Sequence, residues 1–508
     1  MKRTSRFLSR LMATRSDHQV PVICPDQLPE DGQLSEQWFF DLFEGCADVR
    51  IFRHQIQGGD AADAVILIYC DGMSDVTQIN QFVVPRIRHL PKSYVTGLQS
   101  VIDLDLQAIH EVDQIVKRVF AGKLVLYFTR LQQLYVYDAA KVPDRQPEES
   151  NTELSIKGPR DGFVENLEIN AALVRKRLRT NALRYEQYVI GRKSETRVAL
   201  LYIHGYIRPE ILQEARKRLT NIQVDTLLSS AQLEEMMSDS SLSLFPLTTY
   251  TGRPDFVVEC LIRGRLAILV DGSPIAYIAP VNLTLLIKTP EDFYFPTHIV
   301  LFQMCIRLFG LWIALFLPGF WIALTSYNVE QLPFPLLATV VNTRLGLPMP
   351  GPVEAFLMLA LFEIFREAAI RLPKPVGQTI AVVGGIIVGD AVIRAGLAST
   401  TMLIVAALTA VATFTLVNQT LSASVTVVRN IINAAAAFLG MYGCILSIVY
   451  IIIYLSRLES FGLPYLAPLS PLRPKYLLAA LFKEKPTSDN KRIDFLYDSG
   501  EADPGDRP

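Results

Sequence analysis

Two different patterns of hydrophobic and polar positions follow one another along the chain. From residue 35 to residue 296, short apolar runs alternate with amphipathic stretches, a pattern typical of buried strands connected by helices. Residues 64–69 (AVILIY) and 198–203 (VALLYI) are predicted strands, each followed by a turn and a helical stretch. We expect the first of these helices, residues 75–84, to end at Pro85, and we place Pro209 in the first turn of the second.

The order of strand, glycine turn, helix and hairpin occurs twice in this half of the chain. Residues 122–139 and 264–280 each predict a β-hairpin, the second with Asp271 and Gly272 as its turn. The repetition predicts two similar α/β subdomains, residues 35–145 and 146–296, with a linker rich in proline and acidic residues near their junction. Such a pair could enclose a ligand cleft or serve as a scaffold for assembly, and no phosphate loop or nucleophile elbow decides between them.

Residues 297–468 predict an all-α polytopic membrane domain of four to six helices. Between residues 308 and 455 only 11 of 148 residues are charged, and Pro318 predicts a kink in the first span. Runs of about 20 apolar residues are long enough to cross the roughly 30 Å hydrocarbon core. The four predicted spans are residues 308–327, two spans within 375–428 that turn near residues 396–400, and residues 430–456.

One apolar helix in this block, predicted over residues 352–372, carries charges that a lipid-facing helix would not tolerate. Each charge at the bilayer centre costs about 2.5 to 3.5 kcal/mol, so the helix should face a water-filled cavity, a partner or the interface. The alternative is that these charges form buried ion pairs that only fix helix packing. With two charges in the next span, the candidate pore or intramembrane charges are Glu354, Glu363, Arg366, Glu367, Arg371, Asp390 and Arg394.

The two ends of the chain and its overall composition complete the expected organisation. Residues 1–34 form a basic tail and residues 469–508 a polar tail that we expect to be largely disordered; the distribution of Lys and Arg places both in the cytoplasm. The net charge of −1 argues against a nucleic-acid partner. Six scattered cysteines and six histidines have no metal-ligand spacing, so no metal and no cofactor is expected.

Several motifs in sequence order resemble one known family. They are residues 253–258 (RPDFVV), 261–274 (LIRGRLAILVDGSP), 352–355 (PVEA), 365–374 (FREAAIRLPK) and 460–468 (SFGLPYLAP). Over residues 158–468 the chain resembles the A subunits of the GerA family of spore germination receptors. Gly252 stands where the family usually has glutamate, and Phe293 where tyrosine is common, which indicates a divergent paralogue.

The resemblance implies a subunit of a nutrient germinant receptor in the inner membrane of a bacterial endospore. Its implied partners are a transporter-like B subunit and a lipoprotein C subunit, and A subunits are expected to oligomerise into an ion-conducting channel or signal-transmitting core. Arginine and aspartate side chains in its motifs suit salt bridges between domains or subunits. These assembly candidates are Arg253, Asp255, Arg263, Arg265 and Asp271.

Two other classes of function compete with a receptor subunit. A stand-alone secondary transporter could build a midplane site from Asp390, Arg394 and the glycines at 384 and 385. The large polar half and the absence of an inverted repeat oppose this alternative. An enzyme with a membrane anchor is disfavoured, since its candidate residues have no partner at motif spacing. Those residues are Asp71, His204, Glu259 and Asp271.

Overall fold

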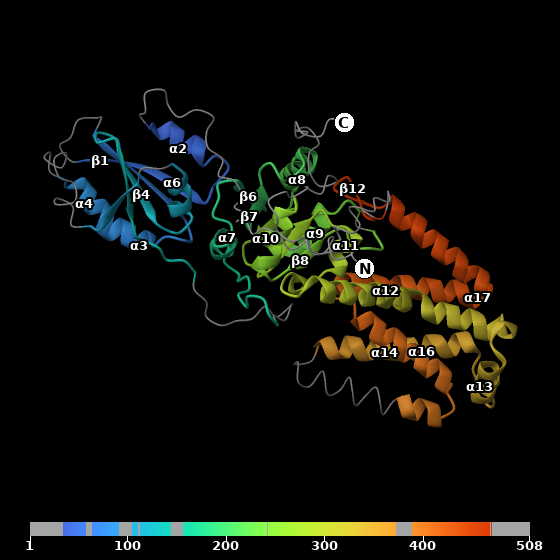
Figure 1. Cartoon of the computed structure of the whole chain (residues 1–508). Coiled ribbons are helices and arrows are strands. Elements are labelled where there is room, and N and C mark those ends of the chain that lie inside the picture. The colour runs from blue at the N-terminus through green and yellow to red at the C-terminus, as the bar shows by residue number, and fades with distance from the viewer. Residues whose placement is uncertain are drawn as a thin grey trace, which may run out of the picture. The chain divides into compact units, whose positions relative to one another are not determined.

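A computed structural model describes residues 34–56, 63–90, 104–109, 112–143, 156–240, 242–371, 389–467 and 469 (Figure 1). These residues belong to two compact units. The first unit contains the described residues up to 240 together with Tyr250–Pro280, and the second contains Leu242–Thr249 and the described residues from Val281 onward. The first unit holds two α/β subdomains, and the second is mostly helical.

The first subdomain is a five-stranded antiparallel sheet with helices on both faces. The strand order is β1-β2-β4-β5-β3, and every neighbouring pair runs antiparallel. Its elements are α2 (Glu36–Leu42), β1 (Val49–Gln55), β2 (Ala64–Cys70), α3 (Val76–Gln78), the π-helical η1 (Ile79–Val83), α4 (Val84–Arg88), β3 (Leu106–Ile109), α6 (Val112–Val119), β4 (Leu124–Phe128) and β5 (Gln133–Tyr137).

Strand β2 is apolar throughout because both faces of the sheet are covered. Alternate side chains of a strand point to opposite faces. Ile66 and Ile68 belong to the core that includes α2 and α6, while Val65 and Leu67 belong to the core that includes η1 and α4. The continuous run of residues 64–69 is therefore a central, two-sided strand, as predicted.

The helix after β2 does not end at Pro85, so this prediction was wrong. The π-helical turn η1 separates α3 from α4, and Pro85 lies in the first turn of α4, which continues to Arg88. A first-turn residue needs no intrahelical partner for its N–H group. Proline is therefore compatible with a new helical segment at this point.

The second subdomain repeats the topology of the first. Its strand order is β6-β7-β9-β10-β8, and the pairs β6–β7, β7–β9 and β9–β10 are antiparallel. The prediction of two similar α/β subdomains is thus confirmed. The elements are α7 (Leu167–Arg175), β6 (Leu183–Ile190), β7 (Thr196–Ile203), α8 (Pro209–Asn221), α9 (Ser230–Met237), β8 (Thr249–Thr251), α10 (Pro254–Ile262), β9 (Leu266–Val270) and β10 (Ala276–Ala279).

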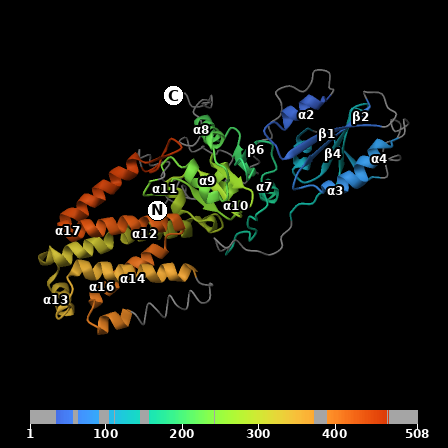
Figure 2. The same ribbon diagram turned by 180° about the vertical axis from the view of Figure 1, so that it is seen from behind.

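The second unit is built around four helices, α12, α14, α16 and α17, which share one apolar core. Figure 2 shows α12, α14 and α16 running beside one another. The elements of this unit are α11 (Leu283–Ile287), the 3₁₀-helical η3 (Pro290–Phe293), α12 (Thr297–Ser326), the 3₁₀-helical η4 (Val329–Gln331), α13 (Phe334–Arg344), α14 (Gly351–Arg371), α16 (Thr400–Phe414), α17 (Gln419–Arg457), β11 (Glu459–Ser460) and β12 (Leu463–Pro464).

Two described helices, α12 and α17, are long and apolar enough to cross a membrane, and α16 is apolar but shorter. Helix α12 continues on both sides of Pro318. The predicted turn near residues 396–400 is present between a helical segment that ends at residue 394 and the start of α16. Most of the predicted span within residues 375–389 lies outside the described residues.

The apolar run that follows α16 is divided differently from the prediction. A turn over residues 415–418 separates α16 from α17. Helix α17 is interrupted at Gly440, whose φ of 62° and ψ of −140° are not helical. Residues 430–456, predicted as one span, therefore belong to two helical limbs.

Candidate functional site

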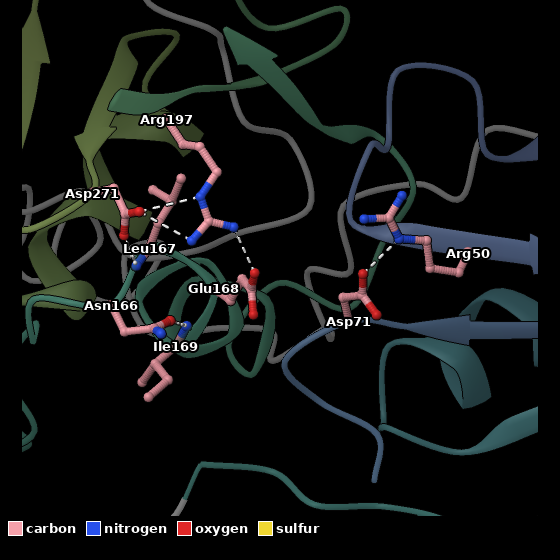
Figure 3. Close-up of polar contacts among 8 residues, drawn as sticks. All are labelled: Arg50, Asp71, Asn166, Leu167, Glu168, Ile169, Arg197 and Asp271. Atoms are coloured by element: carbon pink, nitrogen blue, oxygen red, sulfur yellow. Dashed lines mark hydrogen bonds and ion pairs between the residues drawn. The ribbon is translucent and has the colours of Figure 1, made fainter. Parts of the chain in front are cut away.

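The two Asp-Gly turns of the repeated subdomains lie near the first turn of α7 (Figure 3). The Leu167 N–H donates to Asp271 Oδ1 at 3.2 Å, and Arg197 donates through Nε and Nη2 to Asp271 Oδ2 at 3.2 and 3.0 Å. Arg197 Nη1 also donates to Glu168 Oε1 at 2.8 Å. These hydrogen bonds to Glu168 and Asp271 raise the pKa of Arg197. Asp271, an assembly candidate, thus has partners within its own subdomain.

The corresponding turn of the first subdomain approaches the same helix. Arg50 Nε donates to Asp71 Oδ2 at 2.6 Å. The next residue, Gly72, has a φ of +75°, and a Cβ atom there would lie 2.9 Å from the carbonyl oxygen of Glu168. Only glycine meets both the backbone conformation and this close approach without strain. The turn therefore acts as a contact between subdomains, and the carboxylates around it are paired rather than free for catalysis.

A buried ion pair joins the two subdomains beside this contact. Arg175, the last residue of α7, donates from Nε and Nη2 to Asp48 Oδ2 and Oδ1 at 2.7 and 2.9 Å. The side chains are 1% and 6% exposed. Arg175 Nη1 donates to the Thr180 carbonyl at 2.9 Å, and the guanidinium carbon lies 4.1 Å from the centre of the Phe120 ring. The pair is bidentate and fully enclosed, so it holds a fixed geometry.

Two cysteine thiols lie next to this ion pair. Burial raises the pKa of Cys46, and the nearby Arg175 only partly offsets that effect. Burial, followed by the charge of Asp48, raises the pKa of Cys70 well above 9.0. Burial alone would lower the pKa of Arg175, but Asp48 raises it above its usual value. The thiols are thus protonated packing groups rather than nucleophiles.

The remaining assembly candidates surround α10. Arg253 donates to Asp255 Oδ1 at 3.1 Å and to Oδ2 at 2.7 Å, and both side chains are buried. Arg263 Nε donates to Glu259 Oε1 at 2.8 Å, and Arg265 Nε donates to the Pro280 carbonyl at 3.2 Å. Each arginine has a partner in its own subdomain. Their part in contacts between subunits stays a prediction.

In the helical unit, Glu354 and Glu363 occupy different environments on α14. Glu354 is 2% exposed, and its Oε1 accepts hydrogen bonds from the N–H and the hydroxyl of Ser399, the N-cap of α16. Glu363 pairs with Arg366, one turn further along α14, and its Oε2 lies 3.4 Å from Nη2 of Arg429 on α17. Both carboxylates therefore connect α14 to a neighbouring helix.

Arg429 extends the second of these environments into a cluster across three helices. Its side chain is 4% exposed, and Nη1 donates to the Thr413 hydroxyl of α16 at 3.2 Å. Arg366 Nη1 donates to the Ser422 hydroxyl of α17 at 3.3 Å. One turn beyond Arg429, the side chain of Asn433 is fully buried, and neither amide atom has a hydrogen-bond partner among the described residues. We call Glu363, Arg366, Thr413, Ser422 and Arg429 the charged cluster.

Asp390 and Arg394, two other predicted intramembrane charges, lie apart from this cluster. Asp390 and Arg394 form an exposed pair of their own, with Arg394 Nε 2.7 Å from Asp390 Oδ2. Glu367 is exposed on α14, and the side chain of Arg371 lies outside the described residues. Among the described residues, no group of three or more His, Cys, Asp or Glu side chains is arranged to hold a metal ion.

The comparison with protein families decides what this chain is. The family described as Bacillus/Clostridium GerA spore germination protein matches residues 37–495. The chain belongs to the GerA family. The family match covers both α/β subdomains and the helical unit, and it agrees with the resemblance that the motifs from residue 158 onward predicted.

Individual GerA relatives cover most of the chain. Spore germination protein XA of Bacillus anthracis is 40% identical over 90% of this chain and 94% of its own length. The protein of Bacillus subtilis named uncharacterized membrane protein YfkQ is 32% identical over 85% of each chain. A solved N-terminal domain, from the A subunit of the Bacillus megaterium spore germinant receptor GerK3, is 26% identical over 48% of this chain and 92% of its own, with a TM-score of 0.37.

Sequence reasoning missed three residues that build the sites of this GerA chain. Asp48, Arg175 and Arg429 each pair with a residue far away in the sequence. The signal for Arg429 was available, because it is an isolated charge between two long apolar runs. Asp48 and Arg175 carry no comparable signal, since they lie in ordinary polar surroundings of the sequence.

Proposed function

We propose that this GerA chain is the A subunit of a nutrient germinant receptor in the inner membrane of the bacterial spore. Support comes from the family match along the chain, from relatives named as spore germination proteins, and from two helices long enough to cross a membrane. In this proposal the N- and C-terminal regions are cytoplasmic. A transporter-like B subunit and a lipoprotein C subunit complete the receptor.

We further propose that several copies assemble through their helical units into an ion-conducting or signal-transmitting core. The charged cluster carries this part of the proposal. Charges in an apolar helical unit are costly and usually mark an ion path or a coupling element. Glu363, Arg366 and Arg429 connect α14 to α17, and Arg429 also reaches α16, so a shift of one helix changes the charge environment of the others.

The decisive experiment replaces Glu363 by glutamine in spores. We expect Glu363→Gln to abolish or greatly slow nutrient-triggered cation release, because it removes the carboxylate that pairs with both Arg366 and Arg429. Protein level is measured in parallel by immunoblotting. The matched control is Glu330→Gln in η4, a glutamate outside the cluster, which should leave release unchanged.

Two outcomes would contradict the proposed core. Normal cation release in Glu363→Gln spores with normal protein levels would mean that the cluster only fixes helix packing. A purified full-length chain that is monomeric and carries no ion flux in liposomes, alone or with its partner subunits, would contradict assembly into a conducting core. The immunoblot distinguishes a loss of cation release caused by missing protein from one caused by the substitution itself.

A further inference from the structure

Four helix ends meet at a polar junction in the second unit. Arg344 ends α13, Gly351 begins α14, and Ser399 caps the N-terminus of α16. Thr325 lies in the last turn of α12. These residues surround a cavity of about 10 Å³, which Glu354 and Thr401 also line. A cavity of this size has room for about one water molecule.

Glu354 enters this junction with only one of its carboxylate oxygens occupied. Oε1 accepts from the Ser399 N–H at 2.6 Å and from the Ser399 hydroxyl. Within the described part of the chain, no protein donor reaches Oε2. The side chain is almost completely buried, and an ionised carboxylate in that position needs hydrogen bonds to more than one oxygen. Both Ser399 contacts end on Oε1, so any hydrogen bond to Oε2 must come from the cavity.

Arg344 supplies the opposite charge on the same cavity. Its Nη1 donates to the carbonyl of Thr325 at 3.1 Å, while Nε and Nη2 have no protein partner among the described residues. Arg344 and Glu354 both line the cavity but form no direct ion pair. A guanidinium and a carboxylate that face one small cavity without touching leave both a donor and an acceptor open.

We propose that this cavity is a binding site for a single water molecule that joins Arg344 to Glu354. The water accepts a hydrogen bond from the guanidinium of Arg344 and donates one to Oε2 of Glu354. The two side chains together carry no net charge, so a neutral ligand suits the site better than a cation or an anion. A molecule that both donates and accepts is the one that satisfies both groups.

The bridge would fix α13 to the helices around it. Val340 is the one buried residue of α13, and it packs with Leu324 and Leu332 in a small apolar cluster that is separate from the main core. Arg344 ties its C-terminal end to α12 through Thr325 and, through the water, to α14 and the N-terminus of α16. Arg344 and Glu354 are thus positioning residues for the four helix ends.

A double-mutant cycle on the full-length chain in nanodiscs tests the coupling. Arg344→Met removes the donors, and Glu354→Gln removes the negative charge but keeps an oxygen for Ser399. Thermal unfolding is followed through tryptophan fluorescence, to which Trp321 in the cavity wall contributes together with Trp38 and Trp312. We expect each single variant to lower Tm by several degrees, and Arg344→Met to add little in the Glu354→Gln background. If the Tm shift of the double variant equals the sum of the two single shifts, the two side chains are not coupled and the proposal is overturned.

A second variant displaces Arg344 without removing either charge. A Cβ at Gly351 would lie 2.4 Å from Nη2 of Arg344, so Gly351→Ala should push the guanidinium away from the cavity and lower Tm. Gly389→Ala is the matched control, because a Cβ there meets Leu403 only at 3.7 and 3.9 Å. If the Tm of Gly351→Ala is unchanged or raised, as in the control, the displaced guanidinium has no structural role and the bridge is contradicted.

The water itself is tested on the unmodified chain. A cryo-electron microscopy map that shows other buried waters should show a peak within about 3.2 Å of both the Arg344 guanidinium and the Glu354 carboxylate. A map of that quality without the peak would overturn the proposal. None of these measurements involves ion flux, so their outcome is independent of the proposed receptor function.

Discussion

Arg175 and Asp48 form a bidentate ion pair that is closed off from solvent between the two α/β subdomains. The two residues are 127 positions apart in the sequence. A buried pair of this kind contributes little net stability compared with apolar residues of the same size, but either partner alone is very unfavourable. Its effect is to make the two subdomains depend on each other.

Asp48→Asn should lower the free energy of unfolding of the first unit by about 3 to 5 kcal/mol, because it leaves the Arg175 charge buried and uncompensated. Urea titration with hydrogen-exchange mass spectrometry of the β2 and α7 peptides measures this loss. Arg50→Gln, which breaks the exposed pair with Asp71, serves as the control and should cost about 1 kcal/mol or less. Equal effects of the two variants would show that burial of the pair is unimportant.

Gly440→Ala should disrupt the break in α17. A Cβ at this position would lie 2.9 to 3.2 Å from atoms of the Tyr327 side chain, and the backbone conformation already favours glycine. Gly346→Ala isolates the backbone effect, since its φ is +85° and no atom lies within 4 Å of the added Cβ. We expect the free energy of unfolding to fall by about 1 to 2 kcal/mol in the control and by more in Gly440→Ala. Thermal unfolding measures both losses. Equal losses of stability in the two variants would mean that the Tyr327 side chain moves aside at no measurable cost.

Glu186 should make the first unit sensitive to acid. Burial alone would raise its pKa, but hydrogen bonds from Arg216, Tyr202 and Tyr188 lower the pKa below 4.5. Burial and the Glu186 carboxylate in turn raise the pKa of Tyr188 to about 12. Because the folded state depresses the Glu186 pKa, its stabilising contribution is complete above the unfolded value and is lost as the pH falls through the folded value.

Glu186→Gln should therefore flatten the dependence of stability on pH below about 4.5. Urea midpoints of the β6 and β7 peptides at a series of pH values measure this slope in the variant and the unmodified chain. Glu210→Gln, at the first turn of α8, is the control because Glu210 is not among the hydrogen-bond partners that surround Glu186. Identical slopes for Glu186→Gln and the unmodified chain would contradict the depressed pKa.

Cys70 should resist alkylation in the folded protein. Thiolate is the reactive form, and burial raises the pKa of this thiol well above 9.0. At pH 8.5, iodoacetamide should leave Cys70 unmodified for as long as the first unit is folded and should label it rapidly in urea. Cys305, which is exposed, is the internal positive control. Mass spectrometry that finds Cys70 labelled as fast as Cys305 under native conditions would refute the expectation.

The sequence by itself predicted the repeated α/β architecture and the family. Strands such as β2 and β9 are continuous apolar runs closed by Asp-Gly turns, and these features depend on local chemistry that the sequence displays directly. The charged helix α14 was also predictable with nearly correct bounds, because apolar residues recur along its whole length from Gly351 to Arg371 and prolines lie at both ends, at positions 350 and 373. Turn residues directly next to these strands in the sequence set where the strands end.

Only the tertiary structure decided which charges meet and where an apolar run changes direction. The pairs Arg175–Asp48 and Glu363–Arg429 form between residues that are distant in sequence, and nothing in the local pattern selects one partner over another. The sequence around Gly440 is equally compatible with a continuous helix; packing against Tyr327 fixes the break. Local propensity acts over a few residues, whereas ion pairing and close packing depend on segments that the folded chain brings together.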